Sequence, residues 1–141
     1  MKRLMTDFLF AAAALAALAA AAHAQVLTAD IPFAFHAGGK GMSAGTYQIA
    51  MEPGSSMRIM RVQNVDTHAA VMLSNFVGRD PSKAWRAAGT PKISFECAAT
   101  RCALREVWTG SETSLRINGP KPGPEDAVQV TEIRMTRAPA M

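Results

Sequence analysis

The stretch KISFECAATRCALREVW, residues 92–108, decides the fold. Apolar and polar side chains alternate on both sides of its centre, and a period of two is typical of a β-strand with one buried face. The pattern predicts one strand over 92–97 and another over 102–108, joined by the four-residue loop Ala98–Arg101. Because short loops join neighbouring antiparallel strands, the stretch predicts a β-hairpin in an all-β protein.

The two cysteines stand at the ends of this loop, so the hairpin places Cys97 directly opposite Cys102. Opposite residues in a non-hydrogen-bonded pair have Cα atoms about 4.5 Å apart, a separation that allows a disulfide. A redox dithiol usually has two residues between its cysteines, and a zinc site needs more ligands nearby, so both alternatives are weaker. The sequence therefore predicts a Cys97–Cys102 disulfide, which is typical of proteins outside the reducing cytoplasm.

Alternation and turn residues recur on both sides of this hairpin and predict further strands. These strands are expected at 31–35, 47–52, 57–64, 69–75 and 114–117. We expect a glycine-rich loop over 36–45 and a long crossover with one helical turn over 76–91. Together the elements predict a single antiparallel β-sandwich or a partly open barrel of about seven strands.

The end of the chain changes in composition. Residues 119–126 are rich in proline and glycine and predict a linker after a β-domain that spans 25–118. Residues 127–141 follow as a C-terminal strand or tail. The spacing of the valine and isoleucine residues in this last segment fits a strand or a short helix, and the β-branched composition favours the strand.

Residues 1–24 have the three parts of a secretory signal peptide. Lys2 and Arg3 supply the positive start, the uncharged apolar run 8–22 follows, and small residues allow cleavage after Ala24. The apolar run is short for a membrane span, which makes an uncleaved anchor the weaker alternative. We therefore expect a signal-peptide helix, a periplasmic or secreted protein, and no stable membrane span after cleavage.

Charge and motifs exclude several classes of function. The chain after residue 24 carries a net charge of +3 and has no run of lysine and arginine, which argues against a nucleic-acid partner. Residues 38–41 are glycine-rich but lack the spacing of a phosphate-binding loop. The sequence has neither a Gly-x-Ser-x-Gly elbow nor a His-Glu-x-x-His motif. We therefore predict a protein that is not an enzyme and holds no cofactor.

One charged residue falls on an apparently apolar face. Glu106 is in phase with Leu104 and Trp108, and Arg61 is in phase with Ile59 on its own strand. An inward carboxylate needs a partner, so the pattern predicts a buried Arg61–Glu106 ion pair. The alternatives are a ligand-binding carboxylate at a barrel mouth and a β-bulge that turns Glu106 outward.

Methionine and histidine raise the question of a metal. Seven methionines follow residue 24, and together with His36 and His68 they offer the soft ligands that copper prefers. Met57 and Met60 are three residues apart on a predicted strand, so they point to opposite faces. Methionine also fills irregular gaps in cores, and this interpretation is favoured. The sequence predicts no metal site.

Three stretches share one pattern: IPFAF at 31–35 with AGTYQI at 44–49, VQNVDT at 62–67, and PKISF at 91–95 with LREVW at 104–108. This combination resembles an uncharacterised family of small secreted bacterial proteins. The resemblance implies a compact all-β domain and no assigned activity, so it transfers no functional residue. The chain departs from the family pattern in its two cysteines, in residues 82–90 and in its proline-rich end.

These observations favour a binding or structural module of the cell envelope with an unknown envelope or extracellular partner. Pro32 on an edge strand and the loops 36–45 and 76–91 are the expected contacts, because loops on rigid sheets usually carry function. A small-molecule or lipid carrier is one alternative, since a closed eight-stranded barrel can hold one ligand. A periplasmic copper-binding protein is the other.

Overall fold

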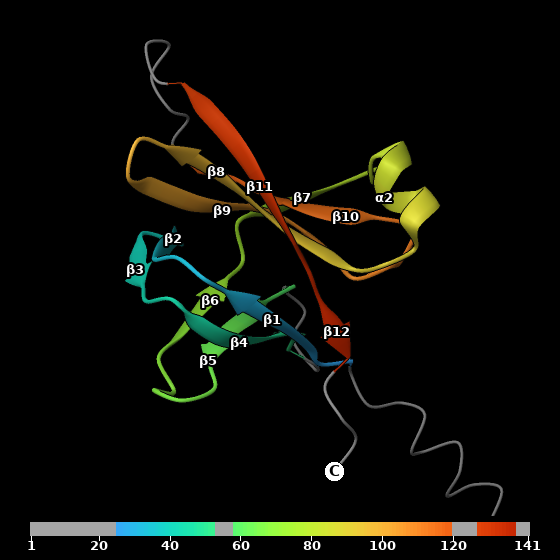
Figure 1. Ribbon diagram of the computed structural model, residues 1–141. Helices are drawn as coiled ribbons and strands as arrows, with labels where there is room; N and C mark the ends of the chain where they lie inside the picture. The colour runs from blue at the N-terminus through green and yellow to red at the C-terminus, as the bar shows by residue number, and fades with distance from the viewer. Residues whose placement is uncertain (1–24, 53–57, 120–126, 138–141) are drawn as a thin grey trace, which may run out of the picture.

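The computed structural model describes residues 25–52, 58–119 and 127–137, which form two β-sheets packed face to face (Figure 1). The prediction of an all-β sandwich is confirmed. The described residues contain twelve strands rather than about seven, because several short strands lie in predicted loops. The predicted signal peptide, 1–24, and the predicted linker, apart from Gly119, lie outside the described residues.

The first sheet, sheet A, has the strand order β12-β1-β4-β5-β6, and all its neighbours are antiparallel. Alternate residues point into the core, so Met60 and Val62 are buried while Arg61 and Gln63 are only half-buried. The strands of sheet A are β1 (Leu27–Ile31), β4 (Gly45–Met51), β5 (Met60–Asn64), β6 (Ala70–Leu73) and β12 (Thr136–Arg137).

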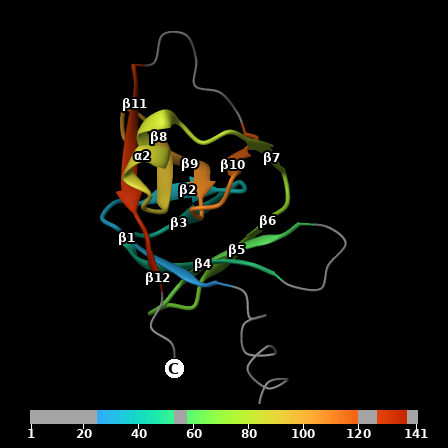
Figure 2. The same cartoon turned by 90° about the vertical axis from the view of Figure 1, so that its right-hand side faces the viewer.

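The second sheet, sheet B, has the order β11-β8-β9-β10-β7 and carries the hairpin β2–β3 beside β9. Figure 2 shows sheet B above sheet A, with the short helix α2 beside sheet B. The strands of sheet B are β2 (Phe35–Ala37), β3 (Lys40–Met42), β7 (Phe76–Arg79), β8 (Lys92–Ala98), β9 (Arg101–Trp108), β10 (Ser114–Ile117) and β11 (Val128–Arg134).

The chain crosses from sheet A to sheet B directly after β1. The segment 31–35, predicted as one strand, is divided: Ile31 ends β1 and Phe35 begins β2. Proline has no N–H to donate, so Pro32 ends the ladder of sheet A at this point. The ring of Phe33 then packs edge-on against Phe95, with 5.1 Å between ring centroids, and anchors the crossing in the core.

A hairpin replaces part of the predicted loop 36–45. Ala37 pairs with Lys40, which leaves Gly38 and Gly39 as a two-residue turn, and both glycines have positive φ (57° and 78°). Two positive φ angles are what a type I′ hairpin turn requires. A Cβ on Gly38 would lie 2.8 Å from Leu73 Cδ2, so the turn rests directly on β6 of sheet A.

The predicted crossover 76–91 begins with the edge strand β7 and contains the expected helical turn, α2 (Lys83–Ala88). The hydroxyl of Ser82 caps the helix by accepting a hydrogen bond from the Trp85 N–H at 3.2 Å. Trp85 stacks on Trp108 of β9 with 6.3 Å between centroids, and its indole N–H donates to Glu132 of β11. Through these contacts α2 covers the outer face of sheet B.

The last described segment is a strand, as the composition favoured. β11 pairs with β8 over seven residue pairs, and β12 pairs with β1 of sheet A. Met135, between the two strands, is buried, and its N–H donates to the carbonyl of Pro91. The segment is therefore part of the same sandwich as residues 25–118 rather than a separate tail.

Side chains fill the space between the sheets. Phe35 makes edge-on ring contacts with both Tyr47 of sheet A and Phe95 of sheet B, at 5.2 Å in each case. The hydroxyl of the fully buried Tyr47 donates to the Ser43 carbonyl at 2.6 Å, which satisfies its only polar group. The buried core also includes Leu27, Ile31, Ile49, Met60, Val62, Ile93, Leu104, Val107, Leu115 and Met135.

Candidate ligand pocket

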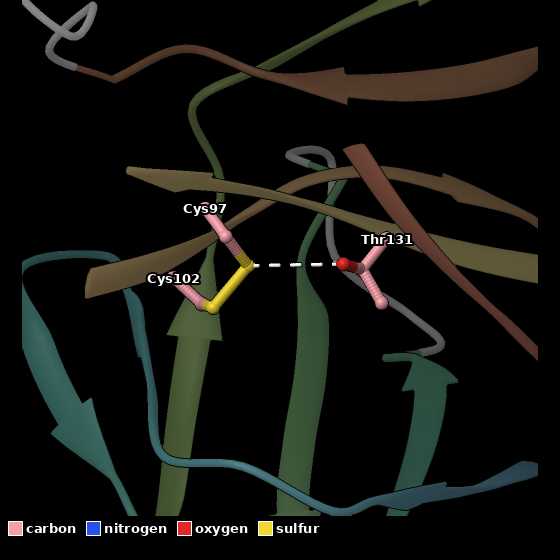
Figure 3. The surroundings of a disulfide bond; sticks show 3 residues. All are labelled: Cys97, Cys102 and Thr131. Atoms are coloured by element: carbon pink, nitrogen blue, oxygen red, sulfur yellow. Dashed lines mark hydrogen bonds between the residues drawn. A yellow bond between two sulfur atoms is a disulfide. The ribbon is translucent and has the colours of Figure 1, made fainter. Parts of the chain in front are cut away.

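The predicted disulfide is confirmed. Cys97 and Cys102 are directly opposite in the β8–β9 hairpin, their Cα atoms lie 4.0 Å apart, and their sulfur atoms are bonded. Figure 3 shows the bond beside β11, where Thr131 Oγ1 lies 3.9 Å from Cys97 Sγ. The disulfide therefore joins β8 to β9 at the point where β11 begins to cover them.

The hairpin continues beyond the disulfide. Ala98 pairs with Arg101, so the connection is the two-residue turn Ala99–Thr100 rather than the predicted four-residue loop. Ala99 has a φ of 53°, a left-handed conformation that costs a residue with a Cβ about 1–2 kcal/mol. The disulfide one pair away holds the two strands together and so supports this strained turn.

A β-bulge interrupts β9 six residues before its end, and it decides where the charged side chains point. Phe95 pairs with Leu104 and Ser94 pairs with Glu106, so Arg105 is an extra residue in the ladder. Leu104 and Val107 both reach the core, three residues apart. Glu106 is thereby placed on the outer face beside Ser94. The bulge considered in the sequence is the arrangement that the structure contains.

The predicted Arg61–Glu106 ion pair is wrong. Arg61 lies on the outer face of sheet A, where its Nε is 3.1 Å from Glu52 Oε1. Glu106 lies on the outer face of sheet B, accepts a 2.6 Å hydrogen bond from Ser114 and has Arg79 Nε at 3.6 Å. The two residues face away from the core on different sheets, because the true buried phase of β5 contains Met60 and Val62.

The bulge leaves one edge of β9 without a strand partner over a short distance. On this edge β10 pairs with β9 only at Val107 and Glu106, and β2 pairs with it only at Ala103. Leu104 and Arg105 lie between these two partners. Bulges commonly end strand pairing next to functional sites, and here the bulge opens a notch in sheet B.

A pocket of about 840 Å³ occupies this notch. Its floor is made by buried apolar side chains from both sheets, namely Leu73, Leu104 and Ile117. Its walls are the β2–β3 turn, the end of the β8–β9 hairpin and the segment where Asn118 bonds to Asn75. The remaining lining residues are His36, Gly38, Gly39, Met72, Ser74, Glu96, Ala98, Ala99, Thr100, Arg101, Cys102, Ala103, Arg105 and Gly119.

The charged groups of the pocket form one network and one separate cation. Glu96 receives Arg105 Nε on one carboxylate oxygen at 2.9 Å and Arg116 Nη2 on the other at 3.0 Å. Arg105 and Glu96 are both largely buried, which makes their pairing stronger than that of a surface ion pair. Arg101 stands at the exposed rim, at the first position of β9.

Sequence reasoning missed Arg105, Glu96 and Gly119 as site residues. A Cβ on Gly119 would lie 2.6 Å from Arg105 Nη1, so this glycine allows the backbone to approach the guanidinium closely. The sequence signal for Gly119 was assigned only to a linker. Arg105 and Glu96 were outside the analysis because alternation placed neither of them on the inner face.

The candidate copper ligands are dispersed. Met42, Met60 and Met135 are buried core residues, which supports the packing interpretation for these three. His36 lines the pocket from β2, whereas His68 lies in the turn between β5 and β6 of sheet A. Within residues 25–52, 58–119 and 127–137, no group of three or more His, Cys, Asp or Glu residues is arranged to hold a metal ion.

Comparisons with known protein families, with curated proteins and with solved structures found no match. In the described part of the chain, no helix combines the length and the apolar character needed to cross a bilayer. The fold and the site therefore define a class on their own terms: a disulfide-bonded β-sandwich with one mixed apolar and cationic pocket in sheet B.

Proposed function

We propose that this chain is an exported, non-enzymatic binding module of the cell envelope and that it holds a small amphiphilic ligand in the pocket of sheet B. The pocket at the β9 bulge carries this proposal. Its volume of about 840 Å³ lies within the range of small-molecule sites, which is roughly 300–1,000 Å³. Its floor is apolar and its walls are polar, the combination that ligand sites commonly have.

A rigid frame supports this use of the pocket. The core beneath it is filled with side chains from both sheets, and the disulfide fixes the hairpin that forms one wall. A ligand would therefore meet a preformed surface and would lose little free energy to ordering the protein. A filled interior also means that the proposed ligand site is at the side of the sandwich, unlike the enclosed cavity of a barrel carrier.

A binding role agrees with the state of the pocket's carboxylate. Glu96 is held between Arg105 and Arg116, so its two oxygens support the wall of the pocket. An acid or base in catalysis must instead be free to exchange a proton with a bound substrate. We therefore assign Glu96 to structure and propose binding without chemistry.

Export is part of the same proposal. The N-terminal sequence has the charge and apolar pattern of a signal peptide, and a disulfide is typical of oxidising compartments. A protein recovered from the periplasm or the medium should begin at Gln25, which intact-mass measurement detects directly. Recovery of an unprocessed chain in the cytoplasm would contradict export without bearing on the pocket.

The binding proposal is tested with the neutral apolar dye N-phenyl-1-naphthylamine, whose fluorescence rises in an apolar site. The purified, oxidised protein should bind one dye molecule. Ala103→Trp, which places a large ring in the pocket wall, should weaken binding at least about tenfold, the effect of losing about 1.4 kcal/mol. Ser74→Trp at the exposed rim is the second variant, and Ala69→Trp, outside the pocket, is the matched control.

Circular dichroism shows whether each variant is folded. Equal dye binding by the wild type and by both folded pocket variants would refute the pocket as the binding site, and absence of dye binding would refute the proposed function. Titration with Cu(I) in the same assay tests the copper alternative. One tightly bound Cu(I) that is lost in His36→Ala would favour copper over an organic ligand.

A further inference from the structure

We infer that the pocket selects an anionic amphiphile, a carboxylate with an unbranched apolar tail, and that Arg101 contacts its head group. This inference rests on the proposed function and names the ligand class for the same site. Three features carry it: an excess of positive charge at the pocket, an unpartnered arginine at the rim, and a continuous apolar floor.

The excess of charge follows from the ion-pair network. Arg105 and Arg116 share the single carboxylate of Glu96, so this group of three side chains has a net charge of +1. Arg101 adds a second positive charge at the rim. Glu96 is the only acidic residue among the described residues that line the pocket. A cationic ligand would meet net repulsion here, whereas an anion is attracted.

Arg101 is the arginine available for the ligand. Among the described residues its side chain has no ion pair or hydrogen bond, whereas Arg105 already donates to Glu96. Arg101 also follows the Ala99–Thr100 turn, which the disulfide holds in place one residue further on. A guanidinium binds a carboxylate through two parallel N–H donors, which gives the head group a defined orientation.

The floor determines the rest of the ligand. Leu73, Leu104 and Ile117 lie below the rim and present apolar surface from both sheets. Burial of a methylene group contributes about 0.8 kcal/mol, so affinity should rise about fourfold with each carbon added to the tail. A head group at Arg101 and a tail over these residues account for the whole length of the pocket.

Isothermal titration calorimetry of the oxidised protein tests the ligand class with decanoate, decylammonium, decanol and octanoate. Decanoate should bind one to one. Octanoate should bind about fifteenfold more weakly because it lacks two methylenes. Decylammonium should bind more weakly than decanol, and decanol more weakly than decanoate. Equal affinity for decanoate and decanol would overturn the inference that the pocket selects an anion.

A substitution tests the role of Arg101. Arg101→Gln should weaken decanoate binding about fivefold, as expected for an exposed ion pair, and should leave decanol binding unchanged. Arg134→Gln on β11 makes the same charge change outside the pocket and should alter neither affinity. An equal loss of decanoate affinity in both variants would show a general charge effect and refute the head-group contact.

The two proposals fail in different ways. If the neutral dye binds and the four probes show no preference for the carboxylate, the binding function stands and the inferred ligand class is wrong. If decyl sulfate binds like decanoate, the site recognises an anion of either chemistry, and the carboxylate assignment is replaced by that broader class. If neither the dye nor any probe binds, the proposed function itself fails.

Discussion

Sheets A and B belong to one sandwich, yet they differ in regularity. Sheet A is an unbroken antiparallel ladder, and its Arg61–Glu52 ion pair lies on the surface with side chains 38% and 32% exposed. Sheet B contains a bulge, an attached hairpin and a pocket, and its Arg105–Glu96 pair is only 10% and 19% exposed. The difference shows how a regular sheet can support a second sheet in which one additional residue creates a site.

Deletion of Arg105 should have the largest effect, because it would make sheet B as regular as sheet A. Without this residue, Leu104, Glu106 and Val107 alternate between the core and the outer face, and β10 can pair further along β9. Dye binding should fall at least about tenfold, equivalent to about 1.4 kcal/mol.

The deletion variant should remain folded, with a free energy of unfolding within about 3 kcal/mol of the wild type, the upper value for one charged hydrogen bond. Dye titration and urea unfolding measure both quantities. Undiminished dye binding by the folded deletion variant would show that the bulge is not what makes the pocket.

Removal of the disulfide should have the next largest effect. The double variant Cys97→Ala with Cys102→Ala should lower the free energy of unfolding by about 2 kcal/mol, because the loop that the bond closes is short. The strained Ala99 turn should open first, and dye binding should weaken with it. Urea unfolding of the variant and the oxidised wild type measures the change. A variant with unaltered dye affinity would show that the wall does not depend on the bond.

The two ion pairs give the smallest effects and the most direct comparison of the sheets. Glu96→Gln should destabilise the protein by about 1.5 kcal/mol, because Arg105 is largely buried and would lose its charged acceptor. Glu52→Gln in sheet A should cost less than about 0.5 kcal/mol, as is usual for exposed pairs. Parallel urea titrations compare the variants, and equal losses would contradict the difference in burial on which this prediction depends.

The regular features could be predicted from the sequence. Alternation in 92–108 was sufficient for the hairpin, and the spacing of Cys97 and Cys102 was sufficient for the disulfide. The helical turn in 76–91 and the last strand also agree with the prediction. In each case a local pattern and the tertiary structure favour the same conformation.

The site could not be predicted, because a bulge changes the phase of a strand without a distinctive residue. Arg105 and Glu106 are both polar, so nothing in the sequence indicates which of them is the extra residue. The phase of β5 was ambiguous for a related reason. Ile59 and Met60 are adjacent apolar residues, and only packing against sheet B decides that Met60 is buried.

The short hairpin β2–β3 was missed although its turn left a signal. Gly38 and Gly39 are a typical two-residue turn, but each flanking strand has only three residues, too few to show alternation. The hairpin is stable because it packs on Leu73 and pairs with β9, both far away in the sequence. Such long-range contacts are the part of the fold that local patterns do not contain.

The passage of one segment from β11 into β12 has a consequence for the order of folding. β11 completes sheet B beside β8, and β12 then pairs with β1, the first strand of sheet A. Neither sheet is complete until the chain has been synthesised as far as Arg137, and contacts over such separations form slowly. For a chain exported as proposed, this delay would keep the polypeptide unfolded during translocation and leave assembly to the far side of the membrane.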